Sequence, residues 1–284
     1  MPSRVAESAL PPHTPNLENG RTMFLAGGCA SCHATPNQED RSRLGGGARL
    51  TTGFGAFYAP NISPDPSDGI GRWSEVDFIS ALWKGTSPDG RHYFPVFPYT
   101  SYQRMQLGDA RDLFFYLKTL PPVAGRAHAH EVSFPFNLRR LLGLWKLVLL
   151  DGKPFEPDPA RSAEWNRGAY LADGPAHCAE CHSPRNFLGA IVPGQRYAGG
   201  PNPEGEGWIP NITQKRLADW SVEDIAQVLE SGETPDGDSV GSAMVATVRN
   251  TSELSTADRN AIAAYIKSLP PAEGPKPPPA KPRP

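Results

Sequence analysis

Side chains that commonly bind metals through sulfur or nitrogen are scarce in this chain. Its 284 residues include four cysteines, four methionines and seven histidines. Neither sign of charge is in large excess, because 28 lysines and arginines face 30 aspartates and glutamates. This balance argues against a nucleic acid as partner. The few sulfur and imidazole groups therefore carry most of the information about a functional site.

Long apolar runs are also missing. The longest run, residues 138–150, contains arginine and lysine and is too short to span a bilayer, which needs about 20 apolar residues. Residues 1–16 are polar and rich in proline, and they lack the apolar stretch of a signal peptide. Glycine and proline are abundant, with 28 and 32 residues, which indicates many loops.

The cysteines form two pairs with one pattern, C-A-S-C-H at 29–33 and C-A-E-C-H at 178–182. C-x-x-C-H is the attachment pattern of c-type haem. Its two thiols bond to the two vinyl groups of one haem, and the adjacent histidine lies under the iron as the proximal ligand. The sequence therefore predicts two covalently bound haem c groups. The predicted attachment and ligand residues are Cys29, Cys32, Cys178 and Cys181, with His33 and His182 on the iron.

Three other uses of four cysteines need to be weighed. They can form disulfides in an exported protein, bind zinc, or act as redox pairs. None of these uses explains why a histidine follows both pairs. The haem interpretation explains both histidines and leaves no cysteine over.

The chain repeats itself with a period close to the spacing of the two cysteine pairs. Cys29 and Cys178 lie 149 residues apart, and Pro-Asn-Ile, Trp-Ser, Pro-Asp-Gly and Leu-Pro-Pro strings recur at offsets of 147 to 150 residues. A period this long indicates duplication of a whole domain, since solenoid repeats are much shorter.

Each repeat has the same helical plan. Apolar residues at i, i+3 and i+4 predict a helix before the cysteine pair, a second after Trp-Ser and a third before Pro-Pro. No convincing alternating strand pattern is present, so we predict an all-α fold of two tandem domains with extensive loops, each holding one covalent haem c. The predicted helices are 17–25, 74–83 and 107–120 in the first repeat, and 164–171, 221–229 and 256–269 in the second.

We predict five segments along the chain. They are an N-terminal extension at 1–15, a first domain at 16–123, a linker at 124–162, a second domain at 163–271 and a proline-rich tail at 272–284. The linker contains an apolar, basic helix near 138–150, for which packing across both domains is favoured over contact with a membrane surface.

The sixth iron ligand decides between electron transfer and catalysis. Methionine in this position stabilises ferrous haem and suits an electron carrier, whereas an open position lets a substrate bind. Met244 lies between Pro-Asp-Gly and the last helix and is the predicted ligand in the second domain. Phe97 occupies the corresponding place in the first domain and cannot bind iron. Met105 is the predicted substitute there, with His92 or an open site as alternatives.

Two further pairs of residues have a haem-related and a structural interpretation. Asn61 and Asn211 follow proline in repeated loops, where they can bond a haem propionate or stabilise a turn. Arg49 and Arg196 can neutralise a propionate, although solvent exposure is the usual state of an arginine.

The chain resembles bacterial two-haem cytochromes c related to the cytochrome c subunits of quinoprotein alcohol and gluconate dehydrogenases. The resemblance covers nearly all of residues 16–271 and is carried by the strings G-C-A-S-C-H, Y-A-P-N-I-S, F-P-V-F-P-Y-T-S-Y and W-N-R-G-A-Y-L. It implies an electron carrier, and not an enzyme, that works in the periplasm between a dehydrogenase or quinol-oxidising complex and a terminal oxidase.

This chain departs from the pattern of that family in two ways. Members commonly have Pro-Ala-Met-Pro-Tyr where this chain has Pro-Val-Phe-Pro-Tyr at 95–99, which supports Met105 as the substitute ligand. The dehydrogenase subunits usually carry three haems, whereas this chain has two attachment patterns. Because covalent haem is added outside the cytoplasm, we expect an exported protein whose signal or N-terminal membrane anchor has been removed.

The alternative function is a two-haem enzyme. A peroxidase would need an open iron, which the first domain could provide. A thiosulfate dehydrogenase would favour a cysteine ligand, and the chain has no cysteine outside the two attachment patterns.

Overall fold

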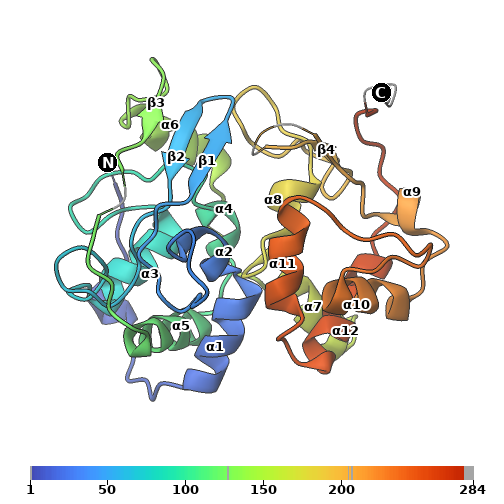
Figure 1. Ribbon diagram of the computed structural model, residues 1–284, viewed down its shortest axis with the longest axis horizontal. Helices are drawn as coiled ribbons and strands as arrows, with labels where there is room; N and C mark the ends of the chain where they lie inside the picture. The colour runs from blue at the N-terminus through green and yellow to red at the C-terminus, as the bar shows by residue number, and fades with distance from the viewer. Residues whose placement is uncertain (1, 127, 204, 206, 278–284) are drawn as a thin grey trace.

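The protein consists of two similar halves that lie side by side, as the ribbon in Figure 1 shows. The computed structural model describes residues 2–126, 128–203, 205 and 207–277. The first half contains η1 (Glu7–Ala9), α1 (Leu17–Ala26), α2 (Cys29–His33), β1 (Arg49–Thr52), β2 (Gly55–Tyr58), α3 (Glu75–Lys84), α4 (Tyr99–Tyr102) and α5 (Leu107–Thr119). The linker contains β3 (Glu131–Val132) and α6 (Leu141–Leu149). The second half contains α7 (Ala163–Asp173), α8 (Cys178–His182), β4 (Gly200–Pro201), β5 (Trp208–Ile209), α9 (Gln214–Leu217), α10 (Val222–Ser231), α11 (Ala243–Thr251) and α12 (Thr256–Lys267).

The six helices expected in the repeats are confirmed to within a few residues at their ends. Their starts follow from local chemistry. Ser74 caps α3 and Ser221 caps α10, and each serine forms a reciprocal capping box with the aspartate three residues later. Both helices end at a glycine in the left-handed conformation, Gly85 and Gly232.

The regular secondary structure of the described residues is mostly helical, but these residues also form five short strands that the sequence does not predict. β1 pairs antiparallel with β2, and β3 from the linker extends this sheet through the pair Gly55 and Val132. In the second half β4 pairs with β5. These strands contain two to four residues each, too few for an alternating pattern to be visible in the sequence.

Each half is closed by a crossing of its first and last long helices, α1 with α5 and α7 with α12. A glycine lies at both crossings, Gly20 against the carbonyl of Asp112 and Gly168 against the carbonyl of Ala261. Each glycine lets the two helix backbones approach more closely than a side chain would permit. The repeated crossing supports the cysteine segments α2 and α8, which follow directly after α1 and α7.

The linker helix α6 contacts both halves, as predicted. The Nζ atom of Lys146 donates to the last carbonyls of α3, on Lys84 at 2.7 Å and on Gly85 at 2.5 Å. On the other side, Trp145 Nε1 donates to the carbonyl of Leu188 at 2.9 Å. None of the helices in the described ranges combines the length and apolarity needed to cross a membrane.

Asp112 on α5 anchors the segment that precedes α1. Its Oδ1 accepts from the backbone N–H of Asn16 at 2.9 Å and lies 2.7 Å from Nε2 of His13, and its Oδ2 accepts from Asn19 at 2.8 Å. Burial opposes ionisation of this carboxyl, but the hydrogen bonds from Asn16, Asn19 and His13 outweigh it and lower the pKa of Asp112.

We expect Asp112→Ala to destabilise the protein by about 1–3 kcal/mol at pH 7, because donors around the carboxylate lose their acceptor. The folded pKa is lower than the unfolded one, so the stabilisation is present above the unfolded pKa and is lost as pH falls through the folded pKa. Urea unfolding of both proteins between pH 7 and pH 3 measures this. The difference should shrink toward acid, and a difference independent of pH would contradict the role given to the carboxylate. Alanine fits the helix crossing, since Ala261 occupies the matching position of α12.

Candidate functional site

The two C-x-x-C-H segments form short helices with the same geometry. α2 follows Gly28 at φ 57°, and α8 follows His177 at φ 41°, so both chains turn through the left-handed conformation just before the first cysteine. Within one helical turn the first and second cysteine lie on the same face, three residues apart, and the histidine follows directly. The local sequence therefore presents two sulfur atoms and one imidazole at one place in each half.

The two histidines are oriented in the same way. Nδ1 of His33 lies 2.8 Å from the carbonyl oxygen of Pro60, and Nδ1 of His182 lies 2.9 Å from that of Pro210. A carbonyl only accepts, so Nδ1 carries the proton and Nε2 keeps its lone pair for a metal. The Pro-Asn-Ile strings that repeat in the sequence thus supply the partner that orients each ligand.

Burial shapes the protonation of these groups. It raises the pKa of Cys29 to about 12, with Cys32 nearby adding to the shift. It also raises the pKa of Cys178 to about 12, with contributions from Asp173 and Cys181. Burial lowers the pKa of His33 and of His182, although the bond to the proline carbonyl opposes this in each case. The thiols of Cys29 and Cys178 and both imidazoles are therefore neutral at pH 7 in the chain alone.

A large cavity lies beside the first segment and extends to the second. Its volume is about 1440 Å³, more than the 300–1,000 Å³ typical of a small-molecule pocket. Cys29, Cys32 and His33 of the first segment line it, and so does Cys181 of the second. Most of the remaining wall is apolar, including residues of α3, α5 and α6.

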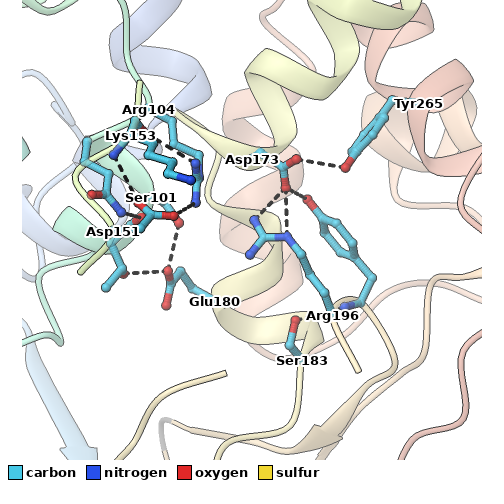
Figure 2. A network of polar contacts seen from close by, with 12 residues as sticks. Ser101, Arg104, Asp151, Lys153, Asp173, Glu180, Ser183, Arg196 and Tyr265 are labelled. Atoms are coloured by element: carbon cyan, nitrogen blue, oxygen red, sulfur yellow. Dashed lines mark hydrogen bonds and ion pairs between the residues drawn. The ribbon is translucent and has the colours of Figure 1, made fainter. Parts of the chain in front are cut away.

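Met105 lies in the wall of this cavity and is only 1% exposed. The segment that carries it is held by the linker: Gln103 Oε1 accepts from the N–H of Gly152 at 2.7 Å, and Gln106 Nε2 donates to the carbonyl of Phe155 at 2.9 Å. Arg104 forms an ion pair with Asp151 at 2.8 Å, which Figure 2 shows. The structure thus places Met105 at the cavity, and its role as an iron ligand stays a prediction.

Met105 also has a counterpart in the second half. Leu254 lies 149 residues later, and both residues precede the last helix by two positions. Both backbone N–H groups donate to the carbonyl three residues earlier, on Tyr102 and Thr251. Leu254 is a core residue at 4% exposure, so this position packs against the fold in both halves.

Met244 is the second residue of α11, a helix that the sequence does not predict. Its side chain is half-buried and packs against the core. Ser242, which precedes the helix, has φ 54° and ψ −140°, and so turns the chain sharply just before Met244. The role of Met244 as the ligand in the second half also stays a prediction.

His92, the alternative ligand in the first half, lies outside the described cavity wall. Its Nδ1 is 3.1 Å from Nζ of Lys146, and its backbone forms a bridge with Thr86. Phe97, in contrast, lines the cavity.

The asparagines and arginines have mainly structural partners. Asn61 Nδ2 donates to the carbonyls of Val123 and Gly125, and Asn211 Nδ2 donates to that of Ala272, so each asparagine ties its loop to the segment after the last helix. Arg196 forms an ion pair with Asp173 at 2.6 Å, and Asp173 also accepts from Tyr265, as Figure 2 shows.

The residues present fit haem c. Two cysteines and an oriented histidine lie together in each half, and the apolar cavity adjoins all three in the first half and Cys181 in the second. Such a cavity suits a flat, mostly apolar ring, while the imidazole Nε2 suits its iron. The structure also shows a contact that the sequence does not predict. The carboxylate of Glu180 accepts hydrogen bonds from Thr100 and Ser101 on α4. The two middle positions of C-x-x-C-H accept many residue types, so the motif gives no indication of this contact.

The sequence also matches known proteins. The family model for cytochrome c matches residues 17–121 and 165–270. The chain is 52% identical to the diheme cytochrome c-type protein of Cereibacter sphaeroides, over 92% of this chain and 88% of the relative. It is 36% identical to the fructose dehydrogenase cytochrome subunit of Gluconobacter japonicus, over 91% of this chain and 53% of the relative. It is 41% identical to a nicotinate dehydrogenase subunit from Pseudomonas putida, over 89% of this chain but 21% of that longer protein.

The resemblance expected from the motifs is thus confirmed. The chain has two covalently bound haem c groups and is an electron carrier, not an enzyme. It spans about half the length of the fructose dehydrogenase subunit. With family matches in both halves and a repeated attachment geometry, the chain belongs to the cytochrome c family.

Proposed function

We propose that each half holds one haem c and that the protein relays electrons in the periplasm. The donor is a dehydrogenase or a quinol-oxidising complex, and the final acceptor is a terminal oxidase. In the first half, Cys29 and Cys32 attach the haem, with His33 and Met105 on the iron. In the second half, Cys178 and Cys181 attach the haem, with His182 and Met244 on the iron.

One observation carries the proposal of one haem per half. Both attachment histidines donate Nδ1–H to a proline carbonyl, at 2.8 Å for His33 and 2.9 Å for His182, and so present Nε2 in equivalent ways. Each bound haem supplies an iron that cycles between ferric and ferrous and exchanges one electron at a time. The chain's residues orient the ligands and surround the site with apolar side chains.

An exposed apolar patch supports a protein partner. On α6, the side chains of Leu144, Leu147 and Val148 are 64%, 81% and 71% exposed. Phe187, in a loop of the second half, is 86% exposed. Trp145 bonds α6 to the neighbouring Leu188, so the helix and this loop form one surface, and Leu144 and Val148 also line the cavity. Exposed apolar surface beside a redox site is typical of docking surfaces.

The proposal is tested by deleting the gene in its native host and measuring oxygen uptake with sugars, alcohols and organic acids. We expect uptake with at least one substrate to fall to the background level. The wild-type gene should restore it, and a gene with Cys29→Ser, Cys32→Ser, Cys178→Ser and Cys181→Ser should not. Unchanged uptake with every substrate would contradict the relay. Slower removal of hydrogen peroxide in that strain would favour the enzymatic alternative instead.

A further inference from the structure

Glu180, inside the second attachment segment, contacts the first half of the protein. Its Oε1 accepts from Thr100 Oγ1 at 2.7 Å and from Ser101 Oγ at 2.8 Å, both on α4. Its Oε2 pairs with Arg185 at 2.6 Å. Glu180 is only 8% exposed, and Figure 2 shows its carboxylate directed toward Ser101. A buried carboxylate with three donors is a strong, specific contact.

The first attachment segment makes the equivalent contact with the second half of the protein. Ser31, inside C-A-S-C-H, accepts at Oγ from Nδ2 of Asn250 on α11 at 2.9 Å. Asn250 is 3% exposed. Ser31 and Glu180 are 149 residues apart, and so are Ser101 and Asn250. Each half therefore uses the same helix position to bond the same motif position of the other half, as in an isologous interface with two-fold symmetry.

The residues that precede the two segments also contact each other. Nε2 of His177, just before Cys178, lies 3.3 Å from the carbonyl oxygen of Gly27, just before the first segment. The ring of His177 packs edge-on against that of Tyr102 on α4, with centroids 5.6 Å apart. α1 and α11 lie next to each other at the centre of the molecule in Figure 1.

We propose that this reciprocal contact is the junction that fixes the two haem-attachment segments against each other, and that Glu180 is its main positioning residue. The inference rests on the proposed function only in assigning one haem to each segment. A fixed junction keeps the two redox sites at one separation, which a relay inside one molecule requires.

The two sides of the junction differ chemically. The first side is a neutral bond between Ser31, which is exposed, and Asn250. The second side holds a buried charge that is paired within its own half by Arg185. Glu180 lies next to Cys181 in the sequence and lines the cavity beside the attachment segments. A negative charge near a haem iron favours its ferric state, because the field acts in a region of low dielectric. Glu180 thus also makes the two sites unequal.

The first test uses Glu180→Gln in the haem-loaded protein, with spectroelectrochemical titration by small-molecule mediators. We expect one of the two midpoint potentials to rise by about 59 mV. For one electron this changes the ratio of reduced to oxidised iron at that site about tenfold. Glu253→Gln is the matched control. Its carboxylate also crosses between the halves, to Arg21 at 2.5 Å, but both side chains are about half exposed, and an exposed pair has little effect.

The second test keeps Glu180 and Arg185 and removes the donors on α4, as Thr100→Val with Ser101→Ala. We expect amide hydrogen exchange in 99–102 and 178–182 to become about tenfold faster, the change that accompanies loss of a hydrogen bond to a charged group. Potentials and exchange rates that match wild type in both variants would overturn the proposal. No protein partner takes part in either measurement, so a failed relay in cells would not affect these results.

Discussion

Replacing Met105 with leucine is expected to convert one of two low-spin ferric signals into a high-spin signal in low-temperature electron paramagnetic resonance. The thioether sulfur of methionine binds haem iron as a sixth ligand, whereas leucine has no donor atom. Met105 is 1% exposed in the wall of the cavity that Cys29, Cys32 and His33 also line. Loss of this ligand would leave five-coordinate iron in the first half.

Leucine separates the ligand role of Met105 from its packing role. Leu254 occupies the matching place in the second half, so leucine suits the position before the last helix. Exchanging methionine for leucine in a core usually costs less than about 1.5 kcal/mol. Met23→Leu is the control, because Met23 is fully buried and lines the same cavity. We expect this control to leave both signals low-spin.

The same measurement on Met244→Leu should convert the other low-spin signal. A wild-type protein that already shows a high-spin signal, unchanged by Met105→Leu, would contradict the assignment of Met105. The first iron would then be open, as the phenylalanine at position 97 permits, and a peroxidase assay would become the next measurement.

Gly168→Ala is expected to be among the most destabilising single substitutions in the second half. A Cβ on Gly168 would lie 1.8 Å from the carbonyl oxygen and 2.4 Å from the carbonyl carbon of Ala261, which are backbone atoms of α12. It would also lie 3.0 Å from Cβ of Tyr265. Backbone atoms cannot rotate away, so α7 and α12 must separate along their contact.

Overpacking typically costs about 1–3 kcal/mol, and occasionally more. The higher helix propensity of alanine offsets about 1 kcal/mol of this cost. We expect a net loss of stability, because here the added Cβ meets backbone atoms that cannot move aside. The measurement is urea unfolding followed by circular dichroism, together with haem content per chain. Gly108→Ala on α5 is the matched control, since nothing lies within 4 Å of its Cβ position. An equally stable Gly168→Ala protein would show that the helices are less tightly packed than the structure indicates.

Much of the candidate site could be predicted because its chemistry is local. Two cysteines and a histidine within five residues meet the requirement for haem attachment without any long-range contact. The long helices were also predictable, because caps such as Ser74 and Ser221 and the apolar period act within a few turns. The duplication follows from repeated strings alone.

Other parts depend on residues that are far apart in the chain. The short strands arise from pairs such as Gly55 with Val132, and two to four residues carry too little pattern to be recognised. Met105 comes to the cavity because Gln103 and Gln106 bond the linker almost 50 residues away. Contacts between residues this far apart leave no periodic pattern in the sequence from which they could be predicted.

Neighbouring residues are enough to specify the two haem attachments, the histidine ligands and the repeated helices, because covalent spacing and helical period are local properties. The way in which the halves meet depends on tertiary contacts instead. Ser101 and Glu180 are 79 residues apart, and Ser31 and Asn250 are 219 apart. Only folding brings these side chains within hydrogen-bonding distance, and there they join the two attachment segments into one unit.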